Sequence, residues 1–207
     1  PIASAAAEED DMETELHRAA KANDADRVAA LIAAGTKIDA RDKAQRTPLL
    51  AATRANAVDA ARLLIEAGAN VNAKDNIRDT PFLYAGAEGR LEILRMTLRA
   101  GANLKDTNRY GGNALIPACH HGHPETVREL LKTDIDIDHI NRLNWTALLE
   151  TIILSDGGST HQDILAQLIA AGANVNIADG NGISPLAHAK QRGYAEMVVM
   201  LERAGAH

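Results

Sequence analysis

The stretch TPLLAATRANAVDAARLLIEAGANVNAKD, residues 47–75, decides the fold because its pattern recurs along most of the 207-residue chain. Equivalent openings lie 33 residues apart and, at the last step, 38 residues apart: Thr14, Thr47, Thr80, Asn113, Thr146 and Ser184. Every opening residue is Thr, Asn or Ser, whose side-chain oxygen caps the N-terminus of a helix. A fixed period of this length predicts a stack of small repeats rather than one globular core.

The second half of each repeat predicts a longer, amphipathic helix. In the quoted stretch, Ala61, Leu64 and Ile65 follow the i, i+3, i+4 spacing that gathers apolar residues on one helix face. Glycine follows this helix in five repeats, where a helix ends in a left-handed cap: Gly35, Gly68, Gly101, Gly172 and Gly205. Asp134 takes that position in the fourth repeat, where we expect a local cost. Each repeat is therefore predicted to run as turn, short helix, turn, longer helix and projecting loop.

This pattern resembles the ankyrin repeat family. The resemblance rests on the TPLL-type openings, on AGANVN at 67–72 and 171–176, and on the pair Gly122-His123. It implies an all-α solenoid of stacked helix–turn–helix units with projecting β-turn loops, in one ankyrin repeat domain that covers residues 12–207. We expect six repeats after a flexible acidic segment at residues 1–11, with these approximate bounds: 12–41, 42–74, 75–107, 108–140, 141–178 and 179–207.

The resemblance also implies a function, namely a non-enzymatic scaffold that binds a protein partner. Its concave groove is lined by loop tips and first helices, and we carry the groove positions over residue by residue. The predicted partner-binding residues are Arg46, Arg54, Arg109, Tyr110, His120, His121, Arg142, Leu143, Trp145 and Ile153. The predicted groove is basic in its early repeats and aromatic or aliphatic in the fourth and fifth, and the only Trp is the expected centre of binding.

An alternative function rests on a cluster of four residues: Cys119, His120, His121 and His123. These residue types bind metals and serve as nucleophiles or bases. Zinc needs four ligands, however, and on one helix only residues three or four apart share a face. His123 also has a structural explanation, because it stands where the second helix of its repeat should begin. The cluster therefore stays the alternative, as a metal-binding or catalytic site.

Two departures from the repeat pattern lie in the same region. Pro117 falls within the first turn of a predicted helix, where we expect it to remove the first hydrogen bond and to push Ile116 out of helical geometry. The fifth repeat carries five additional residues within 153–161, between its two helices. This insertion borders the predicted groove, and it is either a spacer or part of the binding surface.

Composition narrows the expected partners. The net charge is −6, which argues against a general nucleic-acid binder. No apolar run approaches the ~20 residues that a membrane-spanning helix needs, so we expect no membrane insertion. No phosphate-binding or metalloprotease motif is present, and we expect no cofactor. We expect a monomer that binds another protein.

The N-terminal residues carry the acidity of the chain. Six carboxylates lie close together, and without them the rest of the chain is neutral: Glu8, Glu9, Asp10, Asp11, Glu13 and Glu15. A third hypothesis is that this acidic run masks the basic end of the groove. The opening PIASAAAEEDD also matches the end of a signal peptide with a small-residue cleavage site. The Ala-rich chain looks bacterial, and we expect it to be periplasmic or otherwise exported, with a cytoplasmic location as the alternative.

Overall fold

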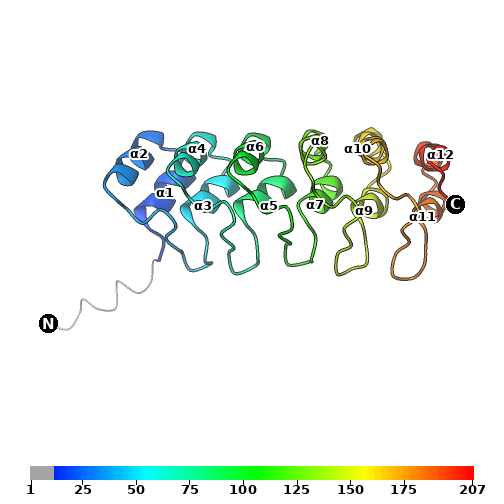
Figure 1. The fold of residues 1–207 in the computed structure, drawn as a ribbon, viewed down its shortest axis with the longest axis horizontal. Coiled ribbons are helices and arrows are strands. Elements are labelled where there is room, and N and C mark those ends of the chain that lie inside the picture. The colour runs from blue at the N-terminus through cyan, green and yellow to red at the C-terminus, as the bar shows by residue number, and fades with distance from the viewer. Residues whose placement is uncertain (1–11) are drawn as a thin grey trace. The chain divides into compact units, whose positions relative to one another are not determined.

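The structure is a computed structural model that describes residues 12–207, so the predicted acidic segment at 1–11 lies outside the described residues. The described residues form helices, turns and loops, with no strand among them. Twelve helices follow one another along this part of the chain (Figure 1): α1 Glu15–Lys21, α2 Ala25–Ala33, α3 Pro48–Arg54, α4 Val58–Glu66, α5 Pro81–Ala87, α6 Leu91–Arg99, α7 Leu115–His120, α8 Pro124–Leu130, α9 Ala147–Ile153, α10 Ser159–Ala170, α11 Pro185–Arg192 and α12 Ala195–Arg203.

The helices belong to two compact units. The first unit comprises residues 12–85 and 92–102, and the second comprises residues 86–91 and 103–207. Within the first unit α1 packs on α3 and α2 packs on α4. Within the second unit α7, α9 and α11 form one layer, and α8, α10 and α12 form the other (Figure 1). Each unit is therefore a stack of helix pairs, and the all-helical prediction is confirmed.

The predicted caps start the first helices. The hydroxyl of Thr47 accepts a hydrogen bond from the backbone N–H of Leu50 at 3.2 Å. Thr80 and Thr146 accept the equivalent bond from the residue three places on. A hydroxyl in this position satisfies one of the N–H groups that the first turn of a helix leaves without a partner. These side chains thus set where the first helices begin, except in the fourth repeat. There the predicted cap Asn113 is wrong, because α7 starts at Leu115, so Ala114 takes the cap position and forms no side-chain cap bond.

The predicted apolar stripe forms the core. Leu64, Leu94 and Leu130 are fully buried on their second helices. The last residue of each stripe is only half-buried, as Ile65 shows, because it lies at the edge of the contact with neighbouring helices. All five predicted cap glycines adopt positive φ, from 78° to 91°. The stacking of small and aliphatic side chains therefore stabilises the repeats, as repeat architectures require.

The fourth repeat ends its second helix differently because it lacks the glycine. Helix α8 stops at Leu130, two residues before the equivalent point of the other repeats. Asp134 does not adopt positive φ. Instead, the Thr133 hydroxyl donates to the carbonyl oxygen of Leu130 at 2.6 Å and accepts from the N–H of Ile135 at 3.3 Å. A threonine side chain thereby closes the turn that glycine closes elsewhere.

The expectation that Pro117 displaces Ile116 is wrong. Both residues lie within α7, which starts at Leu115. The first hydrogen bond is lost, as predicted, because the proline nitrogen has no hydrogen to donate to the carbonyl of Asn113. The side chain of Asn113 compensates by accepting from the N–H of Leu115 at 3.2 Å. A first turn tolerates proline because its N–H groups lack intrahelical partners in any case.

Candidate protein-binding surface

The projecting loops share one device that closes their tips. In each of five loops a single Asp or Asn side chain accepts hydrogen bonds from the backbone N–H groups two and four residues ahead. For Asn141 these donors are Leu143 at 2.9 Å and Trp145 at 3.1 Å. The equivalent residues are Asp42, Asp75, Asn108 and Asp179. Two backbone bonds close the same turn: the N–H of Asn141 donates to the carbonyl of Trp145 at 3.0 Å, and the N–H of Asn144 donates to the carbonyl of Asn141 at 3.0 Å. The residues between its ends, 142–144, are exposed.

Two neighbouring tips in the second unit are joined to each other. The backbone N–H of Arg142 donates to the carbonyl oxygen of Tyr110 at 2.9 Å, and its guanidinium Nη1 donates to the carbonyl oxygen of Arg109 at 2.9 Å. The imidazole Nε2 of His139 lies 2.7 Å from the carbonyl oxygen of Gly111. Three contacts thus hold the two loops side by side, so the side chains on them form one surface.

That surface carries three large apolar side chains in solvent. Tyr110, Ile140 and Leu143 are 53%, 50% and 52% exposed. We call these residues, together with Arg109 and Arg142, the tip patch. Every residue of the tip patch except Ile140 was predicted from the sequence. The only indication for Ile140 was that an apolar residue stands at a predicted loop position. Trp145 is half-buried beneath the turn rather than exposed at its tip.

His120, His121 and Ile153 lie on the ends of first helices in the same unit. Helix α7 ends at His120, and His121 follows as its cap. Nδ1 of His121 lies 2.6 Å from the carbonyl oxygen of Ala87, so this ring is held by the preceding repeat. The rings of His120 and His121 are 4.7 Å apart. Burial lowers the pKa of His120, and the neighbouring His121 and His161 lower it further.

A buried carboxyl group, which was not predicted from the sequence, lies next to His120 and Asn141. Glu150 on α9 has a side chain that is only 7% exposed, with Oε2 at 3.7 Å from Nδ1 of His120. Its Oε1 accepts a hydrogen bond from Nδ2 of Asn141 at 2.8 Å. Burial raises the pKa of Glu150 to about 7, although the bond from Asn141 opposes the shift. Glu150 thereby orients the amide that closes the tip of the fifth repeat.

The alternative based on Cys119 and its neighbouring histidines gains no support from the geometry. Cys119 is fully buried in α7, and burial raises the pKa of its thiol well above the usual range. A nucleophile or a metal ligand has to be a thiolate, which this environment opposes. His123 caps the start of α8, as predicted. Within residues 12–207, no group of three or more His, Cys, Asp or Glu side chains is arranged to hold a metal ion.

The two predicted residues of the first unit are engaged by carboxylates of the next loop. Nε of Arg46 lies 3.7 Å from Oδ2 of Asp75, and Nη1 of Arg54 lies 3.8 Å from Oδ2 of Asp79. The guanidinium of Arg54 also stacks over the ring of Tyr84 at 4.5 Å. These contacts reduce the positive charge that the sequence predicted for this end of the groove.

The acidic run has local partners where the structure describes it. Glu13 pairs with Lys21, and Glu15 pairs with Arg27. Lys21 is one of the basic residues predicted for the N-terminal end of the groove, whereas Arg27 lies on α2. Residues 8–11 lie outside the described residues, so the masking hypothesis stays a prediction for them.

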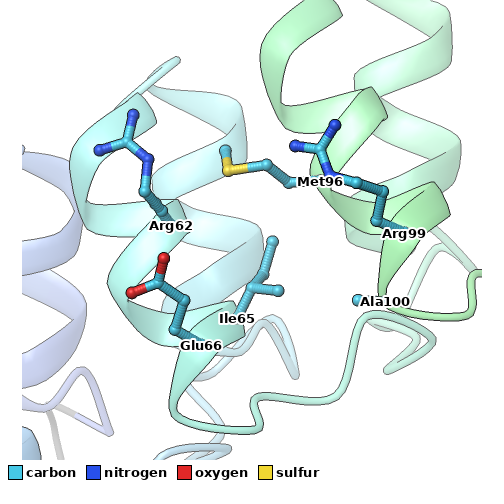
Figure 2. Close-up of a pocket in the computed structure, with 6 residues that line it drawn as sticks. All are labelled: Arg62, Ile65, Glu66, Met96, Arg99 and Ala100. Atoms are coloured by element: carbon cyan, nitrogen blue, oxygen red, sulfur yellow. The ribbon is translucent and has the colours of Figure 1, made fainter.

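A hollow of about 250 Å³ lies elsewhere in the first unit. Figure 2 shows that Arg62, Ile65 and Glu66 of α4 face Met96 and Arg99 of α6, and Ala100 just after it, around the hollow. Nη1 of Arg62 is paired with Asp59 at 2.9 Å. The hollow lies between two second helices, and none of the predicted partner-binding residues lines it. Its mixture of cations and a carboxylate favours no particular ligand.

Comparison with known proteins identifies the family. The family model for ankyrin repeats (3 copies) matches residues 16–108 and 82–179. The chain belongs to the ankyrin repeat family. Ankyrin repeats are protein–protein interaction modules, and the coarse functional prediction agrees with that role. No helix in residues 12–207 has the length and apolar character to cross a membrane.

Solved ankyrin repeat structures match almost the whole chain. An ankyrin repeat domain from Acinetobacter baumannii AYE is 57% identical, with a TM-score of 0.90, over 93% of this chain and 98% of that one. The ankyrin repeat protein EF0377 is 39% identical, with a TM-score of 0.88, over 91% of this chain and 96% of that one. A putative ankyrin repeat protein of Escherichia coli K12, YahD, is 44% identical over 62 residues, which are 30% of this chain and 31% of YahD.

Proposed function

We propose that this ankyrin repeat protein binds a protein partner through the tip patch and the adjoining ends of the first helices in the second unit. The observation that supports the proposal is the exposure of Tyr110, Ile140 and Leu143 on two loops that are hydrogen-bonded to each other. Contiguous apolar side chains in water mark interaction sites in soluble proteins. Binding energy in protein interfaces concentrates in a few such residues, and Tyr and Arg are enriched among them.

The tip patch contributes little to folding, which is a further reason to assign it a binding role. A half-exposed Leu143 at a loop tip gains only part of the free energy that a buried leucine gains. The turn itself is closed by Asn141, so its geometry does not depend on the outward side chains. Selection for stability therefore gives no reason to keep apolar residues at these positions.

The ten predicted partner-binding residues have different places in the proposed binding surface. Tyr110, Leu143, Arg109 and Arg142 form the tip patch together with Ile140. His120, His121 and Ile153 lie on the adjoining helix ends. Trp145 supports the turn from a half-buried position. Arg46 and Arg54 belong to the first unit, where an acidic neighbour accompanies each of them.

The test measures how single substitutions affect binding to a partner purified from the source organism by affinity capture. We expect Leu143→Ser and Tyr110→Ser each to weaken binding by about 2 kcal/mol, roughly 30-fold in Kd, measured by isothermal titration calorimetry. Val199→Ser is the matched control, because Val199 is also an exposed apolar residue of the second unit but lies on α12. Unchanged affinity in both patch variants, or an equal loss in the control, would place the interface elsewhere.

A further inference from the structure

We infer that the tip patch takes a peptide segment in which apolar side chains are flanked by carboxylates. This inference rests on the proposed function and adds the chemistry of the partner to it. The patch consists of three exposed apolar side chains and two arginines on joined loops. Residues 109–112 and 140–145 contain Arg109 and Arg142 but no Asp or Glu, in a protein whose net charge is −6.

The surroundings of Arg142 distinguish it from several other arginines of the described chain. Arg46, Arg54, Arg62, Arg95 and Arg128 each have a carboxylate oxygen within 4.0 Å. Arg142 forms no such ion pair among residues 12–207, and its Nη1 donates to a backbone carbonyl instead. A guanidinium carries five N–H donors, so several remain to bind an incoming carboxylate.

Arg109 presents a second cation beside the same apolar residues. Its guanidinium lies over the ring of Tyr110 at 4.6 Å. Arginine stacks readily on aromatic rings, and this stack holds the positive charge beside the exposed apolar residues. Stacking also fixes the position of the charge, which reduces the entropy lost when a partner binds. The two arginines therefore flank the apolar centre with positive charge at defined positions.

The neighbouring tip in the same unit does not have this character. Residues 179–183 read DGNGI, with the carboxylate of Asp179 closing the turn. No large apolar side chain of this tip is strongly exposed. Within the second unit, the combination of cations and exposed apolar groups is thus specific to the tips at 109–112 and 140–145. Charge complementarity favours an acidic partner there, because like charges across an interface cost free energy.

A nucleic acid fits the patch less well than an acidic peptide. Nucleic-acid binding surfaces neutralise several phosphates with many Lys and Arg side chains. The tip patch offers two cations beside Ile140 and Leu143, which a sugar–phosphate backbone would cover without gain. The aromatic ring of Tyr110 is already covered on one face by Arg109. We therefore commit to a peptide and use an oligonucleotide as a competing probe.

The experiment uses the full 207-residue chain and synthetic peptides with a fluorescent label. One peptide carries a central Leu-Phe pair flanked by aspartates, a second has lysines in place of the aspartates, and a third has serines in place of Leu-Phe. Fluorescence anisotropy at low and high salt gives the affinities. We expect the aspartate peptide to bind at least roughly tenfold more tightly than either other peptide, with the preference reduced by salt.

Variants of the protein assign the preference to the patch. Arg109→Gln with Arg142→Gln should abolish the preference for aspartate over lysine, whereas Leu143→Ser should weaken binding of both apolar peptides. Arg128→Gln is the control, since it removes an exposed arginine of α8 in the same unit. A preference that persists in the double variant overturns the inference. Tighter binding of the lysine peptide or of a single-stranded oligonucleotide also overturns it, as does a lack of saturable binding by the aspartate peptide.

The two proposals fail in distinguishable ways. If the peptides show no charge preference but Leu143→Ser still weakens binding of the captured native partner, the binding surface is correct and the inferred chemistry is wrong. If Leu143→Ser changes neither measurement, the tip patch is not the binding surface, and both proposals are wrong.

Discussion

At the residue scale, two repeats use different side-chain pairs to join a loop tip to the first helix that follows it. In the fifth repeat the amide of Asn141 donates to the carboxyl group of Glu150 at 2.8 Å. In the sixth, the equivalent positions hold Asp179 and His188, and the imidazole Nε2 lies 2.7 Å from the Asp179 carboxylate. Donor and acceptor have exchanged places while the tip turn is unchanged. Each pair links a loop tip to the first helix behind it, so the pair sets the position of that tip.

The raised pKa of Glu150 predicts a pH-dependent stability. In the folded protein the carboxyl keeps its proton up to about pH 7, whereas the ordinary value is 4.5. Folding therefore binds a proton between these values, and the free energy of unfolding falls as pH rises through this window. Glutamine keeps the carbonyl that Asn141 uses but never ionises. We expect Glu150→Gln to match the wild type near pH 5 and to exceed it by about 1–3 kcal/mol near pH 8 in urea denaturation.

Glu125→Gln is the control for this measurement, because Glu125 is exposed on α8. It should leave the free energy of unfolding unchanged at both pH values. A Glu150→Gln protein that is less stable at high pH would show that ionised Glu150 is stabilised instead, with His120 at 3.7 Å as the source of the stabilisation.

The exchanged pair predicts a rescue by double substitution. Near pH 8, above the pKa of Glu150, Asn141→Asp places a second carboxylate where an amide now donates at 2.8 Å, and we expect a loss of about 1–3 kcal/mol because a buried acceptor then has no donor. Adding Glu150→His recreates the arrangement of Asp179 and His188 and should recover most of that loss. A double-mutant cycle by chemical denaturation measures the coupling. Strict additivity of the two changes would show that the positions do not interact.

At the element scale, the insertion in the fifth repeat is a packed loop rather than a loose spacer. The hydroxyl of Tyr194 donates to the carbonyl oxygen of Ser155 at 2.6 Å. Gly157 has φ of +74°, and a Cβ there would lie 2.5 Å from Cδ1 of Tyr194. The ring at the start of α12 therefore fixes the loop that precedes α10.

Two glycine substitutions separate contact from backbone strain. Gly182 has nearly the same φ, +76°, but nothing lies within 4 Å of the position that its Cβ would take. Gly182→Ala should cost about 1–2 kcal/mol from the left-handed conformation alone. We expect Gly157→Ala to cost about 1–3 kcal/mol more, since the methyl group also displaces the Tyr194 ring. The comparison uses thermal unfolding, and equal costs would show that the ring moves aside freely.

The sequence predicted most helix boundaries well because each repeat is defined by short patterns of cap residues and glycines. Thr47 and its equivalents, apart from Asn113, cap the first helices, and glycines end five of the second helices. The early end of α8 was not predictable from Asp134, since the Thr133 turn depends on which hydrogen bonds the backbone can complete. The prediction that Pro117 distorts the helix at Ile116 was wrong, because proline costs little free energy in the first turn of a helix.

The candidate site was predictable in outline only. Repeat periodicity placed Tyr110 and Leu143 on loop tips, where the structure finds them exposed. The burial of Trp145 and the exposure of Ile140 depend on how a turn packs on its neighbours, which no periodicity encodes. Glu150 escaped notice because a single acidic residue on a helix usually faces solvent. Packing between repeats therefore determines which residues of the tip patch are exposed and why Glu150 is buried.

At the scale of the whole molecule, two units divide the described chain, and each contains its own buried stripe. Leu64 in the first unit and Leu165 in the second are both fully buried. Each Leu→Ala change should cost about 2–5 kcal/mol, the usual range for truncation of a buried leucine. Because repeat proteins gain stability from neighbouring contacts, the double variant should lose the sum of the two costs to within about 0.5 kcal/mol. Urea denaturation of the three variants measures this, and a large departure from the sum would reveal coupling between the stripes.

The closed tips have a consequence for how such a protein changes its partner. One Asp or Asn side chain and two backbone hydrogen bonds hold each turn, so the turn at 141–145 is closed without the side chains of residues 142–144. The exposed residues of a tip can therefore be substituted while the backbone conformation of the turn is kept. Exchanging residues 142–144 for residues 180–182 would change the exposed side chains and remove the bond from Arg142 to Arg109, while the closure of the turn itself would stay the same. Each of the five tips therefore offers a separate place for new specificity to arise.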